Sequence, residues 1–162
     1  MPRTFLPALR AVAAWLTALG LLALGFALNA QAMERVPPQV DTSPLPPSAH
    51  TWSEPNPLRG NAQAIAIGQA AFNQSCAHCH GVNANGSRMP APDLRRLGTR
   101  CKRIADDALR ERCQGDADAF FIKSVRHGKQ KFGIVHMPSW EGVVSPELAW
   151  ALRSYVETAP LK

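Results

Sequence analysis

The pentapeptide Cys76-Ala77-His78-Cys79-His80 decides how the rest of the chain is interpreted. Its Cys-x-x-Cys-His spacing is the pattern through which a c-type haem is attached. Two thiols three residues apart on one turn of helix can form thioether bonds to the two vinyl groups of a single porphyrin. The residue that follows then lies under the iron. We therefore predict one covalent haem c on Cys76 and Cys79, with His80 as an axial ligand of the iron.

Two other interpretations of the motif require features that the sequence lacks. A structural zinc site needs two further Cys or His ligands at similar spacing, and the chain has no second Cys-x-x-Cys. A thioredoxin-like redox pair would be expected in a βαβ context. The intervening His78 is expected to be a polar residue without a role in binding.

The iron needs a sixth ligand, and Met137 is the predicted one. A thioether is a soft ligand, and paired with His80 it raises the reduction potential of the iron. His136 is the alternative, which would give a bis-His site of lower potential. Met137 could instead fill a gap in the core. Two other methionines are less suited to this role. Met89 follows His80 by only nine residues, which is a short reach to the opposite face of the porphyrin. Met33 lies in a Pro-rich segment.

Residues 1–32 have the pattern of a secretory signal peptide. Arg3 and Arg10 precede an uncharged run over residues 11–28, and Ala30-Gln31-Ala32 provides a cleavage signature. We predict cleavage after Ala32 and export to the periplasm, where disulfides are allowed. The alternative is an uncleaved membrane anchor, because the apolar run is near the minimum length that spans a bilayer.

Residues 33–60 contain seven prolines and little periodicity, which excludes a helix or a central strand. They form either an extended arm across the domain, held by Trp52 and Leu58, or a loose tether.

The predicted domain spans residues 61–160 and is all-α. Helices are expected over residues 62–74, 116–127 and 146–158, and no segment alternates clearly enough to be a strand. The predicted N-terminal caps are Asn61, Asp116 and Ser145, with Gly128 closing the second helix. Phe120, Phe121, Ile122 and Val125 are expected to line one side of that helix.

The charge balance is mildly basic. The chain carries a formal charge of +6, and beyond residues 1–32 it has 16 Lys and Arg against 12 Asp and Glu. This excess is too small to indicate nucleic-acid binding and favours an acidic partner surface. One basic group (Arg95, Arg96, Arg100, Lys102, Arg103) follows the motif. A second (Lys123, Arg126, Lys129, Lys131) leads into the Met137 loop, where it either surrounds the haem edge or forms a solvated face.

Cys101 and Cys113 remain after the haem cysteines are assigned. In an oxidising compartment an even remainder predicts a disulfide, and the alternative is a pair of buried free thiols. A straight helix would hold their Cα atoms ~18 Å apart, too far for a disulfide. Residues 102–112 are therefore expected to double back, with a short helix over residues 105–112 and a turn before it.

Around these motifs the sequence resembles class I, mitochondrial-type cytochrome c domains over about residues 60–160. The resemblance rests on Gly68-x-x-x-Phe72-x-x-x-Cys76-x-x-Cys79-His80, Ala91-Pro92-Asp93-Leu94, Met137-Pro138-x-Trp140 and Leu152-x-x-Tyr155. It implies a small helical domain wrapped around one haem, with the first helix crossing the last at close range. It also implies that the Pro92 carbonyl accepts the Nδ1 proton of His80, and that Trp140 contacts the haem propionates.

More narrowly, residues 52–61, Cys101 to Cys113 and residues 116–140 resemble periplasmic cytochromes that accept electrons from pyrroloquinoline-quinone-dependent (quinoprotein) alcohol dehydrogenases. This resemblance implies a monomeric one-electron carrier, not an enzyme, that delivers electrons to a downstream cytochrome or terminal oxidase. A haem enzyme with a displaceable sixth ligand and a membrane-anchored subunit of a larger oxidoreductase are the alternatives.

Overall fold

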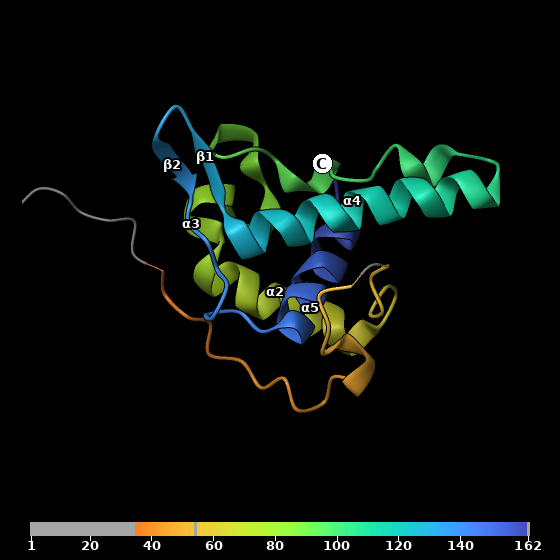
Figure 1. Cartoon of the computed structure of the whole chain (residues 1–162), viewed down its shortest axis with the longest axis horizontal. Helices are drawn as coiled ribbons and strands as arrows, with labels where there is room; N and C mark the ends of the chain where they lie inside the picture. The colour runs from red at the N-terminus through yellow and green to blue at the C-terminus, as the bar shows by residue number, and fades with distance from the viewer. Residues whose placement is uncertain (1–34, 54, 162) are drawn as a thin grey trace, which may run out of the picture. The chain divides into compact units, whose positions relative to one another are not determined.

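Three long helices, α2 (Ala62–Ser75), α4 (Asp107–His127) and α5 (Pro146–Thr158), form the framework of the structure (Figure 1). The computed structural model describes residues 35–53 and 55–161, so the predicted signal peptide lies outside the described residues. The single turn α3 (Ala77–His80) carries the end of the Cys-x-x-Cys-His motif. Short 3-10 turns fill the connections: η1 (Pro47–Ala49), η2 (Val82–Ala84), η3 (Gly86–Arg88), η4 (Leu94–Arg96) and η5 (Cys101–Arg103).

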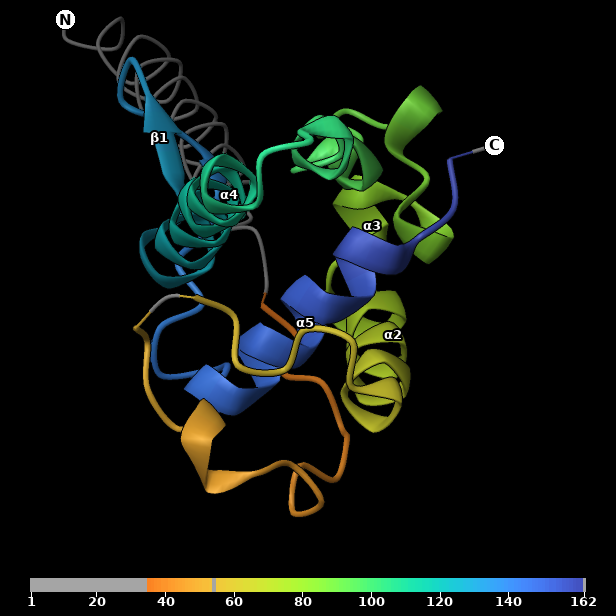
Figure 2. The same ribbon diagram turned by 90° about the vertical axis from the view of Figure 1, so that its right-hand side faces the viewer.

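Helix α5 lies between α2 and α4 (Figure 2), and its contact with α2 forms the centre of the core. The Oδ1 atom of Asn61 accepts a hydrogen bond from the Ala64 amide at 3.0 Å and so caps α2 as predicted. The rings of Phe72 and Tyr155 lie 5.5 Å apart between the two helices. Helix α5 starts at Pro146 as predicted, but the side chain of Ser145 makes no capping bond.

Helix α4 is nine residues longer at its N-terminus than predicted. Asp106 provides the cap, because its Oδ1 accepts from the Leu109 amide at 2.8 Å. The predicted start at Asp116 and the separate short helix over residues 105–112 were therefore wrong. The two segments form one continuous helix. Phe120 on this helix is 55% exposed whereas Phe121, Ile122 and Val125 are buried, so Phe120 does not share one side with them as expected.

The prediction of an all-α fold was wrong in one segment. Strands β1 (Lys129–Lys131) and β2 (Ile134–Met137) form an antiparallel hairpin in the mostly helical structure. Both residues of its turn have positive φ, +51° at Phe132 and +77° at Gly133, as a two-residue hairpin turn requires. The strands escaped detection because they are short and largely exposed, and so lack an alternating apolar face.

The Pro-rich segment lies across the domain in the structure. Leu45, Ala49 and Leu58 are buried in the core. The Trp150 indole N–H donates to the Thr51 carbonyl at 2.7 Å. Of the two arrangements considered for this segment, the described part adopts the packed arm rather than the loose tether.

A buried ionic cluster that the sequence did not indicate fastens this arm to α4 and α5. Asp118, fully buried, accepts from Arg153 Nε at 2.8 Å and from Arg59 Nη2 at 2.8 Å. The Asn56 amide also donates to Asp118, at 3.0 Å. Arg59 reaches Glu157 at 3.0 Å. Because buried charges are tolerated only when paired, this cluster fixes the relative positions of the three segments.

Candidate haem site

An apolar pocket lies among α2, α4, α5 and the segments that join them. Its walls are mainly aliphatic and aromatic side chains, and it brings together residues far apart in the sequence. The lining residues are Phe72, Cys76, His80, Leu94, Phe121, Val125, Met137, Trp140, Val144 and Leu152. Walls of this kind suit a flat hydrophobic cofactor and exclude water from its centre.

The two cysteines of the motif are free thiols at the junction of α2 and α3. Both are half-buried and neither is in a disulfide. Burial raises the pKa of the Cys76 thiol to about 12, and the neighbouring Cys79 adds to the rise. Cys76 is therefore a neutral thiol at physiological pH. Two free thiols on one turn are what two thioether bonds to a single porphyrin require.

His80 ends α3 and is held in one tautomer. Its Nδ1 lies 3.1 Å from the Pro92 carbonyl oxygen. A carbonyl oxygen only accepts, so the proton must be on Nδ1 and the Nε2 lone pair remains available to a metal. Burial lowers the pKa of His80, against a smaller opposing effect of the Pro92 hydrogen bond. The lowered pKa favours the neutral imidazole, the form that binds iron.

Met137 is the last residue of β2 and lines the same pocket. Gly128, at the end of α4, lies directly against it. A Cβ on Gly128 would overlap the Met137 carbonyl oxygen and would lie 2.7 Å from the carbonyl carbon of Pro138. Gly128 has φ +70°, as glycine permits. This close approach fixes where the hairpin rejoins the core and therefore where Met137 lies.

Trp140 also lines the pocket, and its amide donates to the Val125 carbonyl at 2.8 Å. The competing candidate ligands lie elsewhere. His136 is exposed and Met89 is half-buried, and neither lines the pocket. His78 is also exposed. Met33 lies outside the described residues.

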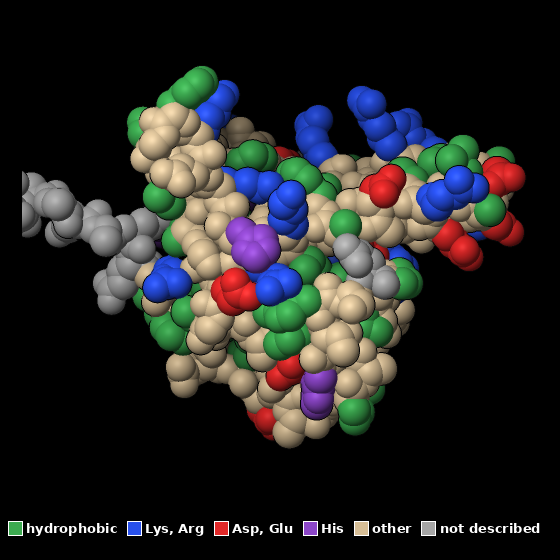
Figure 3. Space-filling view, in the orientation of Figure 1, with side chains coloured by type: hydrophobic (Ala, Val, Ile, Leu, Met, Phe, Trp, Pro, Cys, Tyr) green, Lys and Arg blue, Asp and Glu red, His purple; other side chains and the backbone are tan. Residues whose placement is uncertain are grey.

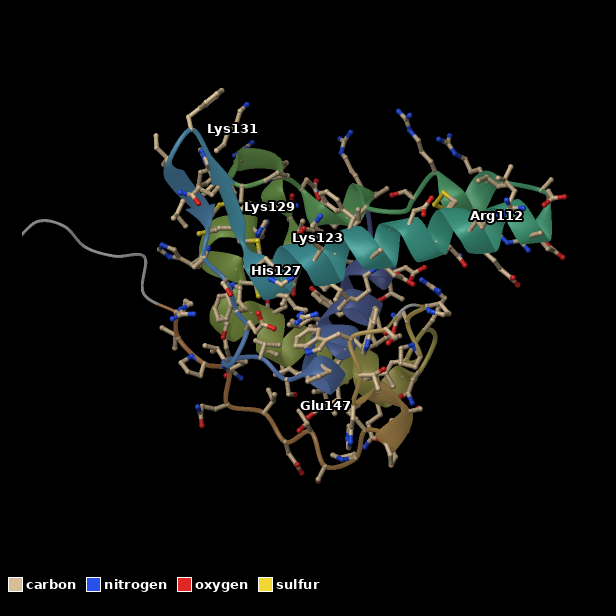
Figure 4. The ribbon with its side chains drawn as sticks, in the orientation of Figure 1. Arg112, Lys123, His127, Lys129, Lys131 and Glu147 are labelled. Atoms are coloured by element: carbon tan, nitrogen blue, oxygen red, sulfur yellow. A yellow bond between two sulfur atoms is a disulfide. The ribbon has the colours of Figure 1, made fainter. Side chains whose placement is uncertain are left out.

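The basic residues of the two groups differ in burial. Arg95 is buried and paired with Asp93 at 2.7 Å, so the first basic group is not wholly a surface feature. Lys123, Lys129 and Lys131 of the second group are exposed. They lie over α4 and the hairpin, where basic side chains gather (Figures 3 and 4). Arg126 is half-buried, lies over the Trp52 ring at 5.0 Å and pairs with Glu141 at 2.6 Å.

Cys101 and Cys113 are joined by a disulfide in the structure, with their Cα atoms 5.5 Å apart. The bond connects η5 to the first half of α4. The chain doubles back between the two cysteines as predicted, with non-helical residues 104–106 before the helix, which is the start of α4 rather than a separate short helix. Neither cysteine lines the pocket.

The sequence missed part of the pocket wall. Phe121 and Val125 were expected only to line one side of a helix, without a binding role, and Val144 was not singled out. An apolar residue that lines a cofactor pocket has the same sequence signal as one that packs in a core. Only the fold distinguishes them.

The chain combines a helical fold, a Cys-x-x-Cys-His turn and an apolar pocket reached by His80, which together define a c-type cytochrome domain. Residues 63–156 match the family described as cytochrome c oxidase, cbb3-type, subunit III, and the chain belongs to that family. It is also 35% identical to cytochrome c550 of Pseudomonas aeruginosa over 147 residues, covering 86% of this chain and 91% of the relative. No solved structure gives a significant match.

The protein therefore carries a covalently bound haem c and transfers electrons without substrate chemistry of its own. The pocket residues fit that cofactor, because the Cys76 thiol, the His80 imidazole and apolar walls line one pocket, and Cys79 provides a second free thiol in the same motif. Within residues 35–53 and 55–161, no helix is both long enough and apolar enough to cross a membrane.

Proposed function

We propose that the protein is an exported, monomeric carrier of single electrons whose haem iron is bound axially by His80 and Met137. The observation that carries this proposal is that both side chains line one apolar pocket although they come from different elements, α3 and β2. Among the described residues that line the pocket, Met137 alone has a soft thioether.

The residues of the chain have distinct tasks in this proposal. Cys76 and Cys79 attach the cofactor, and the Pro92 carbonyl holds the His80 imidazole in the ligating tautomer. When bound, the haem supplies one-electron Fe(III)/Fe(II) chemistry. A His/Met pair favours the reduced state relative to a bis-His pair. Trp140, at the pocket wall, is placed to contact the propionates, as the resemblance to class I cytochromes implies.

We further propose export to the periplasm after cleavage at Ala32, leaving the arm over residues 33–60 and the domain over residues 61–160. The proposed donor is a reduced quinoprotein alcohol dehydrogenase. The reduced quinone of such an enzyme holds two electrons, so two carrier molecules must each accept one. The proposed acceptor is a downstream cytochrome or terminal oxidase. The narrower sequence resemblance in residues 52–61 and 101–140 supports this donor.

The experiment is to mix the purified, oxidised holoprotein with quinoprotein alcohol dehydrogenase and its alcohol, and to follow haem reduction by absorbance. We expect reduction of two carrier molecules per alcohol oxidised. A carrier that ascorbate reduces but the dehydrogenase does not would reject this donor while leaving the carrier function intact.

The family description favours a second candidate, a cytochrome subunit of a membrane-bound oxidase. This candidate requires the N-terminus to be retained as an anchor. Mass spectrometry of the purified protein separates the two. The carrier is expected to have the mass of residues 33–162 plus one haem, whereas an anchored subunit would keep residues 1–32.

A further inference from the structure

The turn of the β1–β2 hairpin holds an aromatic residue where the backbone disfavours one. Phe132 and Gly133 both have positive φ, the pattern of a two-residue turn that favours Asn-Gly or Asp-Gly. A bulky residue with positive φ is a conformational outlier. Strain of this kind is found mainly at functional sites. The choice of Phe132 at this position therefore calls for a functional reason.

Apolar side chains are exposed together around this turn. Phe132 is 90% exposed, and Ile134 and Val135 on β2 are 62% and 53% exposed. Phe120, beside the hairpin on α4, is 55% exposed. Single exposed apolar residues are ordinary, but a group of them marks an interaction surface.

Two lysines lie against these apolar residues, and a third, Lys123, lies further along α4. Lys131 Nζ lies 5.2 Å from the centre of the Phe132 ring, and Lys129 Nζ lies 4.2 Å from the centre of the Phe120 ring. Figure 4 shows Lys123, Lys129 and Lys131 in succession from α4 to the free end of the hairpin. None of the three forms an ion pair with an acidic side chain of the described residues. Their charges are thus available to a partner. We call the four apolar residues and these three lysines the hairpin patch.

The hairpin patch is continuous with the pocket. Strand β2 carries Ile134 and Val135 and ends at Met137, which lines the pocket wall. A protein bound to the patch would therefore sit close to the site of electron exchange. A lipid surface bound there could not exchange an electron.

We propose that the hairpin patch is the docking surface for a redox protein that presents an apolar recess bordered by carboxylates. This inference rests on the proposed carrier function and names the part of the chain that recognises the partner. The aromatic tip at Phe132 enters the recess and slows dissociation, as buried aromatic anchors do. Lys123, Lys129 and Lys131 meet the carboxylates and speed association.

The test uses Phe132→Asn in the holoprotein. Asn suits the turn better than Phe does, so the hairpin is kept while the aromatic anchor is removed. Leu109→Asn is the matched control, because Leu109 is 51% exposed at the other end of α4. Electron exchange is measured against partner concentration, with quinoprotein dehydrogenase as the donor and oxidase-containing membranes as the acceptor.

With at least one of these partners, Phe132→Asn is expected to weaken binding by about tenfold or more, whereas Leu109→Asn does not. Reduction by ascorbate stays at the wild-type rate in both variants. Lys131→Ala is expected to lower the association rate about threefold and to reduce its dependence on ionic strength.

If Phe132→Asn exchanges electrons with both partners as the wild type does, the docking proposal is overturned and the carrier function still stands. Failure of the wild type to exchange with either partner would overturn both. Binding to anionic lipid vesicles is measured as a third outcome. If Phe132→Asn loses the vesicle binding of the wild type while its electron exchange stays unchanged, the patch binds a membrane and the proposal is also overturned.

Discussion

Gly68 of α2 lies against the backbone of Ala151 in α5. A Cβ on Gly68 would overlap the Ala151 carbonyl oxygen and lie 2.5 Å from its carbonyl carbon. The missing side chain therefore permits the close crossing of the two helices. The crossing brings Phe72, which follows Gly68 by one helical turn, onto Tyr155 and into the pocket wall. One glycine thus links the helix packing to the cofactor site.

Gly68→Ala is expected to destabilise the protein by about 1–3 kcal/mol, because the helices must separate to accept the methyl group. Gly115→Ala is the matched control. Gly115 is also helical, but a Cβ there meets nothing within 4 Å, so this change should stabilise α4 by about 0.5–1 kcal/mol. Thermal unfolding of the two holoproteins measures both effects. Equal effects of the two changes would contradict the close packing at Gly68.

Asp118→Ala is expected to destabilise the protein by about 3–5 kcal/mol, because it leaves Arg153 charged, fully buried and without its carboxylate. Asp116→Ala, at an exposed position of the same helix, should have little effect. Denaturant unfolding measures the difference. A loss below about 1 kcal/mol for Asp118→Ala would show that the cluster does not hold the arm.

Asp93 gives a prediction about acid stability. The hydrogen bond from Arg95 is the main cause that lowers the pKa of the Asp93 carboxyl below its ordinary value. A lowered pKa in the folded state stabilises the fold above the unfolded-state pKa near ~3.9, and this contribution is lost as the pH falls through the folded value. Asp93→Asn should therefore lower Tm at pH 7, and its difference from the wild-type Tm should shrink as the pH falls below the unfolded-state pKa. A constant Tm difference across this range would refute the assignment.

Removal of the disulfide by Cys101→Ser with Cys113→Ser is expected to lower the free energy of unfolding by ~3 kcal/mol, because the closed loop no longer restricts the unfolded chain. Neither residue lines the pocket, so the reduction potential should stay unchanged. Potentiometric titration measures the reduction potential, and denaturant unfolding in parallel measures the free energy of unfolding. A shifted potential in a folded variant would mean that the disulfide takes part in the redox site.

The sequence predicted the parts of the structure that follow from local rules. The bounds of α2 and α5 followed from apolar spacing and from the positions of Asn61 and Pro146. A short helix over residues 105–112 was expected, but its continuation through residues 113–115 into the next helix was missed, because this stretch has no apolar periodicity. The hairpin was missed because its strands bury no alternating face. The partners of Asp118 come from segments 35 to 62 residues away, a distance over which sequence spacing carries no signal.

The residues of the candidate site also divide into those that local sequence rules predict and those that only the fold reveals. Cys76, Cys79 and His80 could be found because thioether chemistry fixes their spacing. Pro92 and Trp140 came from a resemblance to known cytochromes, and the structure places both beside the pocket residues. Gly128 had been assigned only to a helix end. Its contact with the Met137 backbone depends on the hairpin returning to α4, which no local pattern indicates.

The axial ligand pair is tested most directly by the absorbance of the oxidised holoprotein and of its Met137→Ala variant. The wild type should show the weak far-red sulfur-to-iron band, and its reduced form should not bind carbon monoxide readily. Met137→Ala should lose the band and bind carbon monoxide, because it removes the thioether from the pocket. A wild type that lacks the band and binds carbon monoxide at neutral pH would contradict ligation of the iron by Met137.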